Sequence, residues 1–319
     1  MILAGGRGTR FWPRSRRKRA KQVLPVVGEH TLIQQTVERL ASLIPPERLW
    51  VITNRYLRGE ILRQLPGVPP SQVIAEPVQR NTAPAIGLAA HLIRRQTPDA
   101  LMGIFPADHV VSQGAEFLRV LRTAKKAAAM GSLVVLGIRP RWPETGYGYV
   151  QFARRFLKSG LHFWNSGMFM WRASTILDAL ERYLPSTAAL LKEVAGGVAL
   201  ENLYPRCENI SIDYAVLEKA RNVVGIPCEI GWSDVGSWNA VYELLPHDAA
   251  RNATRSPLWM LDATGNYVDA PGKLVAAIGI QDLIVVDTPD ALLLVRRDRA
   301  QEVSQVVQWL EKQKREDLL

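Results

Sequence analysis

The chain has 319 residues, of which 47% are hydrophobic and 22% charged, which is ordinary for a globular protein and long enough for one large α/β domain with a smaller appendage. No apolar run approaches the roughly 20 residues of a membrane-spanning helix and no signal peptide is visible, so we expect a cytoplasmic protein without membrane contacts. The formal net charge is +10, but the basic residues are spread along the chain, so we expect no nucleic-acid partner. Cys207 and Cys228 are the only cysteines, too few for a disulfide framework or a zinc site.

The first 22 residues combine a short strand, glycines and basic side chains. Ile2 to Ala4 reads as a strand, and three glycines follow it: Gly5, Gly6 and Gly8. Glycine lets the backbone turn tightly and approach a ligand, and successive N–H groups can form an anion-binding nest. Arg10 and Lys21 would add fixed positive charge. The segment predicts a polyphosphate site, although the glycines alone fit an ordinary strand-to-loop turn equally well.

Two common glycine motifs are absent from this segment. The dinucleotide fingerprint G-x-G-x-x-G and the P-loop G-x-x-x-x-G-K-[ST] both fail, and Pro13 opposes a helix directly after Gly8. This spacing excludes a dinucleotide oxidoreductase. We interpret the dense basic run Arg14–Lys21 as a loop that faces phosphate or solvent.

The chain then alternates between helices and strands. Thr31 is a candidate N-cap with Gln34 three residues on, as in a capping box. Further helices are expected at Tyr56–Leu65, Thr82–Arg95 and Glu116–Met130, and strands at Leu49–Thr53, Val73–Ala75, Leu101–Phe105 and Leu133–Gly137. This alternation predicts a parallel sheet covered on both faces. Ligands of such sheets lie beyond the carboxyl ends of the strands.

Polar side chains stand at those strand ends. The stretches are EPVQRNT (Glu76–Thr82), FPADH (Phe105–His109) and GWSDVGSW (Gly231–Trp238). Asp108 and Asp234 would suit a hard divalent cation such as Mg2+, which favours carboxylate and phosphate oxygens. Taken singly, each Asp is more often a cap or turn residue.

The EPVQRNT stretch has two compatible roles. Asn81 and Thr82 fit an N-cap for the following helix. Glu76, Arg80 and the backbone near Asn81 are also placed to contact the edge of a nucleotide base. His109 has no second histidine or cysteine at metal spacing, so we interpret it as structural.

The middle of the chain contains ETGYGY (Glu144–Tyr149) and WNSGMFMWR (Trp164–Arg172). Glycines in an aromatic strand suggest close approach of a ligand, and Asn165 offers a donor and an acceptor for sugar hydroxyls. A β-bulge with core aromatic residues is the alternative, and spacing alone favours it. Asp213, near the start of a capped helix at Ser211–Lys219, fits a cap as well as a ligand contact.

The C-terminal part of the chain no longer alternates between strands and helices. Short strands at Tyr267–Ala270, Lys273–Ile278, Leu283–Asp287 and Ala291–Arg296 are separated by turns without intervening helices, and one closing helix follows. Polar and turn residues cluster at 251–257. We therefore predict two domains, residues 1–250 and 258–319.

With these motifs in hand, the first segment resembles the sugar nucleotidyltransferase signature GGxGTRLxPLTxxxPK, with Lys21 at the signature lysine. Arg14 stands where Leu is usual and Ala20 where Pro is usual. EPVQRNTAPAI, FPADH, ETGYGY, WNSGMFMWR, SIDYAVLEKA and GWSDVGSW also occur in the order found in mannose-1-phosphate guanylyltransferases, so the chain resembles that family along nearly its whole length.

This resemblance implies a fold and a reaction. The fold would be an α/β, Rossmann-like nucleotidyltransferase domain with a mixed, mainly parallel sheet, followed by a small β-rich domain similar to a short β-helix. The enzyme would transfer GMP from GTP to mannose 1-phosphate, giving GDP-mannose and pyrophosphate, with Mg2+ as cofactor. No sugar isomerase domain is expected after the β-rich part, and a homodimer is left open.

The resemblance also implies roles for individual residues. Catalytic roles fall to Arg10, Lys21, Asp108 and Asp234, the two aspartates holding the metal. Nucleotide-binding roles fall to Leu3, Ala4, Gly5, Gly6, Gly8, Thr9, Glu76, Arg80, Asn81 and Thr82. Sugar-binding roles fall to Tyr147, Gly148, Asn165 and Asp213.

One departure from the family lies between Tyr149 and Trp164. The family carries there a Phe followed shortly by Glu-Lys-Pro, whose Lys usually contacts the sugar phosphate and whose Glu contacts the sugar. Gln151 and Phe152 resemble the start of this motif, but the triplet is absent. Its loss would favour a catalytically silent, nucleotide-sensing subunit. We expect instead that the protein has a loop with this triplet at a point where the sequence omits it. ARRFLKSG supports this expectation, because it resembles the helix that follows the motif. The remaining alternative is the same reaction with a different nucleoside triphosphate and a different sugar phosphate.

Overall fold

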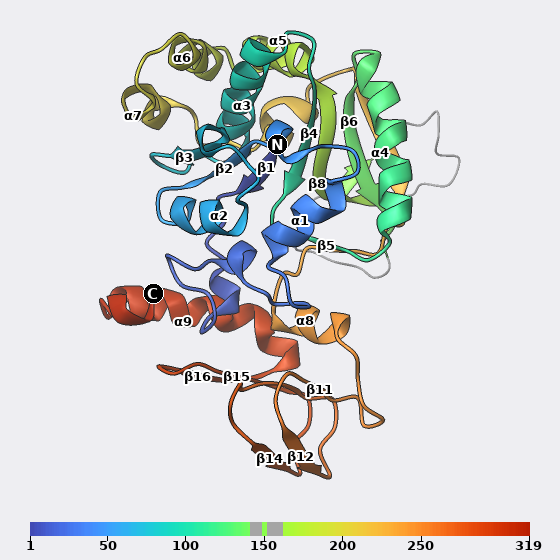
Figure 1. Ribbon diagram of the computed structural model, residues 1–319, viewed down its shortest axis with the longest axis vertical. Helices are drawn as coiled ribbons and strands as arrows, with labels where there is room; N and C mark the ends of the chain where they lie inside the picture. The colour runs from blue at the N-terminus through green and yellow to red at the C-terminus, as the bar shows by residue number, and fades with distance from the viewer. Residues whose placement is uncertain (141–148, 152–161) are drawn as a thin grey trace. The chain divides into compact units, whose positions relative to one another are not determined.

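The structure is a computed structural model that describes residues 1–140, 149–151 and 162–319 (Figure 1). The chain forms two compact units. Residues 1–5 and 36–232 make up the first, which we call the sheet unit, and residues 6–35 and 233–319 make up the second, which we call the signature unit. The glycine-rich signature thus packs with the C-terminal part of the chain. The domain boundary expected between residues 250 and 258 stays a prediction, because these units follow packing rather than chain order.

The sheet unit is built on one mixed sheet in the order β3-β2-β1-β4-β8-β6-β9, with β7 paired to β8. Neighbours are parallel except where β8 meets β4, β6 and β7. The strands are β1 (Ile2–Ala4), β2 (Val51–Asn54), β3 (Val73–Glu76), β4 (Leu101–Pro106), β6 (Leu133–Ile138), β7 (Tyr149–Gln151), β8 (His162–Arg172) and β9 (Val223–Cys228). A small second sheet pairs β5 (Val110–Val111) with β10 (Trp232–Ser233).

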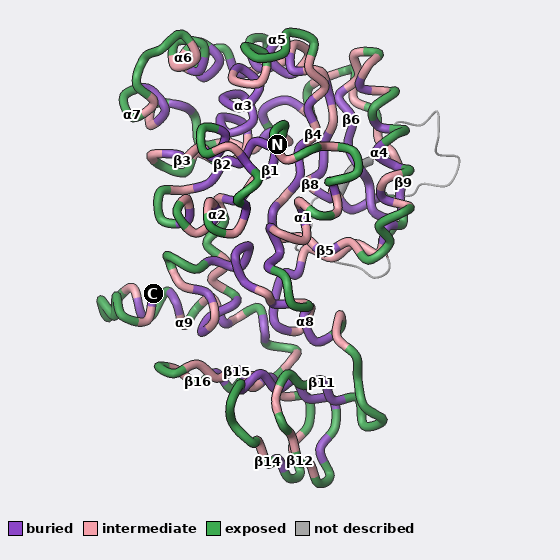
Figure 2. Tube along the Cα trace, viewed as in Figure 1, coloured by how far each residue is buried: buried purple, intermediate pink, exposed green. Residues whose placement is uncertain are grey.

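Helices cover both faces of this sheet because its strands are apolar on both sides. One core lies under α3 and α5 and includes Ile86, Ile176 and Trp171. The other lies under α4 and includes Phe117 and Trp164. Figure 2 shows the buried strands between these layers. The helices are α1 (Leu32–Leu40), α2 (Arg58–Gln64), α3 (Thr82–Gln96), α4 (Gly114–Ala129), α5 (Ala173–Tyr183), α6 (Pro185–Ala195) and α7 (Leu200–Leu203), with a π-helical turn at Asp213–Leu217.

The signature unit contains a small β structure with parallel pairing between sequential turns. β11 (Ala253–Thr254), β13 (Tyr267–Asp269), β15 (Leu283–Asp287) and β16 (Leu292–Arg296) form one sheet, and β12 (Leu258–Leu261) pairs with β14 (Val275–Ile278). Only β15 and β16 are antiparallel within these pairs. α8 (Trp238–Leu244) precedes this structure and α9 (Val303–Lys312) follows it. The expectation of a β-rich, β-helix-like C-terminal part is confirmed.

Most expected elements form within a few residues of their predicted ends. The capping box is present, since the Thr31 N–H donates to Gln34 Oε1 at 3.0 Å. Strands β11 and β12 were not predicted, because they are short and lie in or beside the polar segment that we interpreted as a boundary. Among the described residues, no helix is long and apolar enough to cross a membrane.

Two buried asparagines join successive turns of the β structure. Asn266 is fully buried, and its Nδ2 donates to Asn252 Oδ1 at 3.0 Å and to the Ile280 carbonyl at 3.1 Å. Its Oδ1 accepts the Leu283 N–H at 2.9 Å. One amide side chain therefore satisfies polar groups of three turns, where water is excluded.

We expect Asn266→Ala to lower the free energy of unfolding by about 2–4 kcal/mol, because it leaves buried backbone groups without partners. Gln281→Ala, at an exposed amide in a neighbouring turn, serves as the control and should cost less than about 0.5 kcal/mol. Urea unfolding of both variants measures the difference. Equal stabilities would show that the Asn266 contacts do not hold the turns together.

Candidate active site

The carboxyl ends of four strands meet at one edge of the sheet unit. Ala4 is in register with Thr53, Asn54 with Glu76, and Leu3 with Pro106. The Ala107 N–H donates to the Leu3 carbonyl at 2.9 Å, which carries the chain after β4 along the end of β1. Gly5, Glu76 and Asp108 therefore come to the same edge, as parallel-strand topology predicts.

Gly5 lies within contact distance of the EPVQRNT stretch at this edge. A Cβ at Gly5 would lie 3.4 Å from Glu76 Oε2 and 3.7 Å from Gln79 Nε2, and the Gln79 amide donates to the Gly5 carbonyl. Gln79 was not singled out from the sequence, because an exposed glutamine in a loop carries no distinguishing pattern. It ties the EPVQRNT stretch to the first glycine of the signature.

Glu76 is a buried acid at this edge. It is 6% exposed, and burial raises its pKa from 4.5 to about 7, while the hydrogen bond from the Tyr204 hydroxyl acts in the opposite direction. That hydroxyl donates to Oε1, and Oε2 is the oxygen that faces Gly5. Tyr204 is a second residue that sequence reasoning missed, since it lies 128 positions away.

We expect the free energy of unfolding to fall as pH rises from about 4.5 to about 7 on account of Glu76. Its folded-state pKa is raised, so the folded protein binds more protons in this window and loses that advantage as the carboxyl ionises. Glu76→Gln keeps an acceptor for Tyr204 and removes the charge. It should gain stability over the parent protein, on the order of 2–3 kcal/mol above pH 7 and little below pH 4.5.

Thermal unfolding of the parent, Glu76→Gln and Glu201→Gln proteins between pH 4.5 and 8 measures this difference. Glu201 is exposed in α7 and should give no pH-dependent difference from the parent. A Glu76→Gln difference that does not change with pH would contradict the raised pKa.

The rest of the EPVQRNT stretch is held mainly by protein groups. Asn81 caps α3, its Oδ1 accepting the Thr82 N–H at 2.9 Å, with its backbone at φ 64°. The Thr82 hydroxyl accepts the Ile212 N–H at 2.8 Å. Arg80 donates to the Pro205 carbonyl. The cap predicted at Asn81 is confirmed, and base contacts by Arg80, Asn81 and Thr82 stay predictions.

Asp108 stands beside a fixed histidine. His109 Nε2 lies 3.8 Å from Asp108 Oδ1, and His109 Nδ1 accepts the Trp232 indole N–H at 3.1 Å. The two rings meet edge to face with centroids 5.3 Å apart. The guanidinium of Arg39 donates to the His109 carbonyl. These contacts support the structural interpretation of His109 and hold the loop that carries Asp108.

Asn165 and Asp213 are brought together although 48 positions separate them. The Asn165 amide donates to Asp213 Oδ1 at 2.6 Å, and burial raises the pKa of Asp213 despite this bond. A Cβ at Gly167 would lie 3.3 Å from Pro106 and 3.9 Å from His109, so this strand runs close to the end of β4. Tyr147 and Gly148, the other predicted sugar contacts, lie outside the described residues, as does the segment of the expected Glu-Lys-Pro loop.

In the signature unit, Gly8 and Lys21 pack directly against each other. Gly8 has φ 62°, and a Cβ there would lie 2.7 Å from Lys21 Cβ. Lys21 is 6% exposed, and its Nζ donates to the carbonyls of Asp234 at 2.8 Å and Val235 at 3.1 Å. The signature lysine therefore anchors the GWSDVGSW loop, a connection that spacing alone does not reveal.

Gly6 and Gly236 differ in what surrounds them. A Cβ at Gly6 would meet nothing within 4 Å, which leaves room for a ligand at the backbone. A Cβ at Gly236 would lie 2.8 Å from Asp234 Oδ2, so this glycine makes room for the carboxylate. The open backbone at Gly6 is compatible with the predicted phosphate nest. Gly8, in contrast, is explained by its contact with Lys21.

The basic segment is extensively paired with the C-terminal part of the same unit. Arg14 forms a bidentate pair with Asp269, and Arg10 donates to Gln301 Oε1 at 2.6 Å. Three further pairs join Arg7 with Glu311, Arg16 with Asp290, and Arg17 with Glu316. The interpretation of the run Arg14–Lys21 as facing phosphate or solvent is thus wrong for Arg14 and Arg16, whereas Arg17 stays exposed to solvent in its pair. Their acidic partners lie more than 250 positions away.

The chain is similar to known proteins in both sequence and structure. A family model for nucleotidyl transferases matches residues 1–251, the stretch that carries every motif described above. The chain belongs to the nucleotidyl transferase family. A second model, for the mannose-phosphate isomerase/GMP-like β-helix domain, matches residues 259–310.

Individual nucleotidyl transferase relatives span nearly the whole chain. The xanthan biosynthesis protein XanB of Xanthomonas campestris is 38% identical, covering 96% of this chain and 72% of that protein. A mannose-1-phosphate guanylyltransferase of Escherichia coli is 37% identical over 351 aligned positions, covering 99% and 74%. Because 351 positions exceed the 319 residues of this chain, that relative carries residues at positions where this chain has none.

A solved structure supports the same fold. The crystal structure of mannose-1-phosphate geranyltransferase from Thermus thermophilus has a TM-score of 0.90 and 33% sequence identity, covering 97% of this chain and 98% of that one. The mixed, mainly parallel sheet and the β-rich C-terminal part are therefore those of a nucleotidyl transferase with an appended β-helix-like domain.

Nucleotidyl transferases of this family generally use a divalent metal ion. In the part of the chain that the structure describes, no cluster of three metal-ligating side chains occurs. Asp108 and Asp234 fit such an ion by the chemistry of their carboxylate oxygens, and the lack of a side chain at Gly236 makes room for the Asp234 carboxylate itself. They belong to different units, and their pairing stays a prediction.

Proposed function

We propose that this nucleotidyl transferase transfers GMP from GTP to mannose 1-phosphate, giving GDP-mannose and pyrophosphate. The observation that carries this proposal is its near full-length likeness to proteins named mannose-1-phosphate guanylyltransferase. The arrangement of Gly5, Glu76 and Asp108 at one sheet edge supports it. We also expect a cytoplasmic location, and a homodimer stays a prediction.

Binding of the nucleotide rests on two groups of residues in this proposal. The backbone of Leu3, Ala4, Gly5, Gly6, Gly8 and Thr9 receives the phosphates, and Arg10 and Lys21 stabilise the triphosphate and the departing pyrophosphate. Glu76 would accept N–H groups of a guanine edge through Oε2, which faces Gly5 while Oε1 accepts from Tyr204. Adenine presents no such pair of donors to one carboxylate.

The chemical step needs alignment rather than a base. The phosphate of the sugar substrate is already an anionic nucleophile, so charge neutralisation and in-line positioning at the α-phosphorus carry catalysis. Asp108 and Asp234 would hold Mg2+, which when bound would supply positive charge to neutralise the phosphates. Asn165 and Asp213 would orient the sugar hydroxyls, together with Tyr147 and Gly148.

Pyrophosphate release tests this proposal. Four nucleoside triphosphates are assayed against mannose 1-phosphate, glucose 1-phosphate and related sugar phosphates, with Mg2+ present. Release dominated by GTP with mannose 1-phosphate is the expected result. Dominance of another pair would keep the mechanism and overturn the proposed substrates.

The absent Glu-Lys-Pro triplet and the aligned positions without a residue in this chain favour one competing function, a catalytically silent nucleotide-sensing subunit. The same assay separates it from the enzyme. Protein that binds GTP but releases no pyrophosphate with any sugar phosphate would support the sensing subunit.

A further inference from the structure

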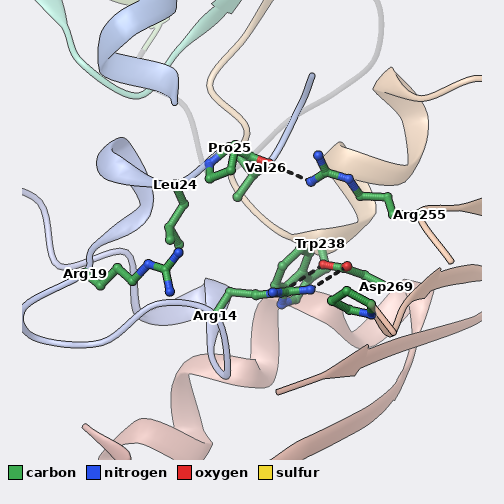
Figure 3. A pocket seen from close by; sticks show the side chains of 9 residues that line it. Arg14, Arg19, Leu24, Pro25, Val26, Trp238, Arg255 and Asp269 are labelled. Atoms are coloured by element: carbon green, nitrogen blue, oxygen red, sulfur yellow. Dashed lines mark hydrogen bonds and ion pairs between the residues drawn. The ribbon is translucent and has the colours of Figure 1, made fainter. Parts of the chain in front are cut away.

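A pocket of about 250 Å³ lies within the signature unit and is separate from the side chains assigned to catalysis. Its polar lining residues are Arg14, Arg19, Arg255 and Asp269 (Figure 3). Neither Arg10 nor Lys21 lines it. Arg10 donates to Gln301, and Lys21 donates to the carbonyls of the GWSDVGSW loop.

The charge of this pocket is positive and only partly balanced. Arg14 and Asp269 neutralise each other through a bidentate pair with donor–acceptor distances of 3.0 and 2.6 Å. Among the described residues, no other acid lines the pocket. Arg255 donates one N–H group to the carbonyl of Pro25 at 2.6 Å and one to that of Gly28 at 2.8 Å, which carry no formal charge, and its other N–H groups remain for an anion. Two guanidinium charges, those of Arg255 and Arg19, are therefore left without a carboxylate.

Arg19 is the uncommitted cation of the set. It is exposed, and its guanidinium has no hydrogen bond or ion pair with the part of the chain that the structure describes. Its backbone is fixed by a β-bridge to Arg16, with both N–H···O bonds formed at 2.9 and 3.0 Å. A fixed backbone beneath an unpaired guanidinium lowers the cost of ordering the side chain around an anion.

The remaining wall is apolar and firmly packed. Leu24, Pro25, Val26 and Pro271 line it together with Trp238, which is 1% exposed and stacks on Tyr267. The Tyr267 hydroxyl is buried beside Arg255 and forms no well-aligned hydrogen bond within the described chain. Guanidinium forks and a rigid apolar wall together suit a small organic anion that carries a phosphate group.

We propose that this pocket binds a small phosphorylated metabolite, with Arg19 and Arg255 holding the phosphate group. The shared chemistry is a phosphate dianion. Its source is either free inorganic phosphate or a phosphate ester whose carbon skeleton lies on the apolar wall. The pocket is a second anion site in addition to the predicted triphosphate site.

Calorimetric titration with inorganic phosphate, without divalent cation, tests the proposal. Arg19→Gln should weaken phosphate binding by about tenfold or more, because it removes charge-assisted hydrogen bonds to the anion. Lys18→Gln is the matched control, since Lys18 is an exposed cation of the same segment that does not line the pocket. It should change the affinity by less than about twofold, as expected for screened surface charge.

Arg10→Gln distinguishes the pocket from the triphosphate site, because Arg10 is exposed and does not line the pocket. It should leave phosphate binding at the pocket unchanged, whereas a loss of binding as large as that of Arg19→Gln would place the anion beside Arg10 and overturn the proposal. Equal weakening by Arg19→Gln and Lys18→Gln, or no phosphate binding by the parent protein, would also overturn it. Because the titration needs no turnover, these outcomes are independent of the pyrophosphate-release assay.

A second titration identifies the source of the phosphate. Glycerol 3-phosphate carries a short skeleton that can contact the wall formed by Pro25, Val26 and Pro271. Tighter binding than inorganic phosphate, sensitive to Arg19→Gln, supports an organic phosphate ester. Weaker binding with the same sensitivity supports the site and assigns it to inorganic phosphate.

Discussion

Lys21→Met is expected to lower kcat by about 100-fold or more, the usual effect of removing one preorganised positive group from a phosphoryl-transfer site. Two effects act together. The variant removes the cation proposed to stabilise the departing pyrophosphate. It also removes the donor that holds the carbonyls of Asp234 and Val235 at 2.8 and 3.1 Å, and so loosens the loop that carries the proposed metal ligand.

Initial rates of pyrophosphate release, measured over a range of Mg2+ concentrations, separate these effects. A loosened Asp234 loop raises the Mg2+ concentration needed for half-maximal rate, whereas loss of the cation alone lowers the maximal rate. Lys18→Met, at an exposed lysine of the same segment, should retain parental turnover. Turnover by a folded Lys21→Met protein within a factor of two of the parent would remove Lys21 from the mechanism.

Many helices and strands of both units could be predicted because their information is local. The capping box at Thr31, the apolar runs of β4 and β6 and the cap at Asn81 each need only a few neighbouring residues. The alternation of strands and helices also predicted that Glu76 and Asp108 lie at the same edge of the sheet. Those predictions rest on general rules of strand and helix geometry.

The partners within the site could not be predicted, because they come from distant parts of the chain. Tyr204 donates to Glu76, but no sequence motif marks Tyr204. Lys21 donates to a backbone carbonyl, which every residue has, so the sequence does not indicate its partner. The basic segment was misinterpreted for the same reason. A run of arginines in the sequence shows its charge, while Asp269 and Asp290, which pair with Arg14 and Arg16, lie in a different part of the chain.

Asp108→Asn is expected to lower kcat by about 100-fold or more while leaving the fold intact. The substitution keeps the size and shape of the side chain but replaces an anionic oxygen donor with an amide, which binds a hard divalent cation far less well. Its surroundings should tolerate the change. Asp108 is partly exposed, and the His109 ring beside it is held by Trp232 independently of the carboxylate.

Asp99→Asn provides the control, because Asp99 is an exposed carboxylate of the same unit, in the connection between α3 and β4. It should retain parental kcat and thermal stability. For Asp108→Asn, an unchanged melting temperature with a lost rate assigns the effect to chemistry, since a folding defect would lower both. If Asp108→Asn keeps more than half of the parental rate at every Mg2+ concentration, Asp108 is not a metal ligand in the reaction. The charge at the α-phosphorus would then have to be neutralised mainly by Arg10 and Lys21.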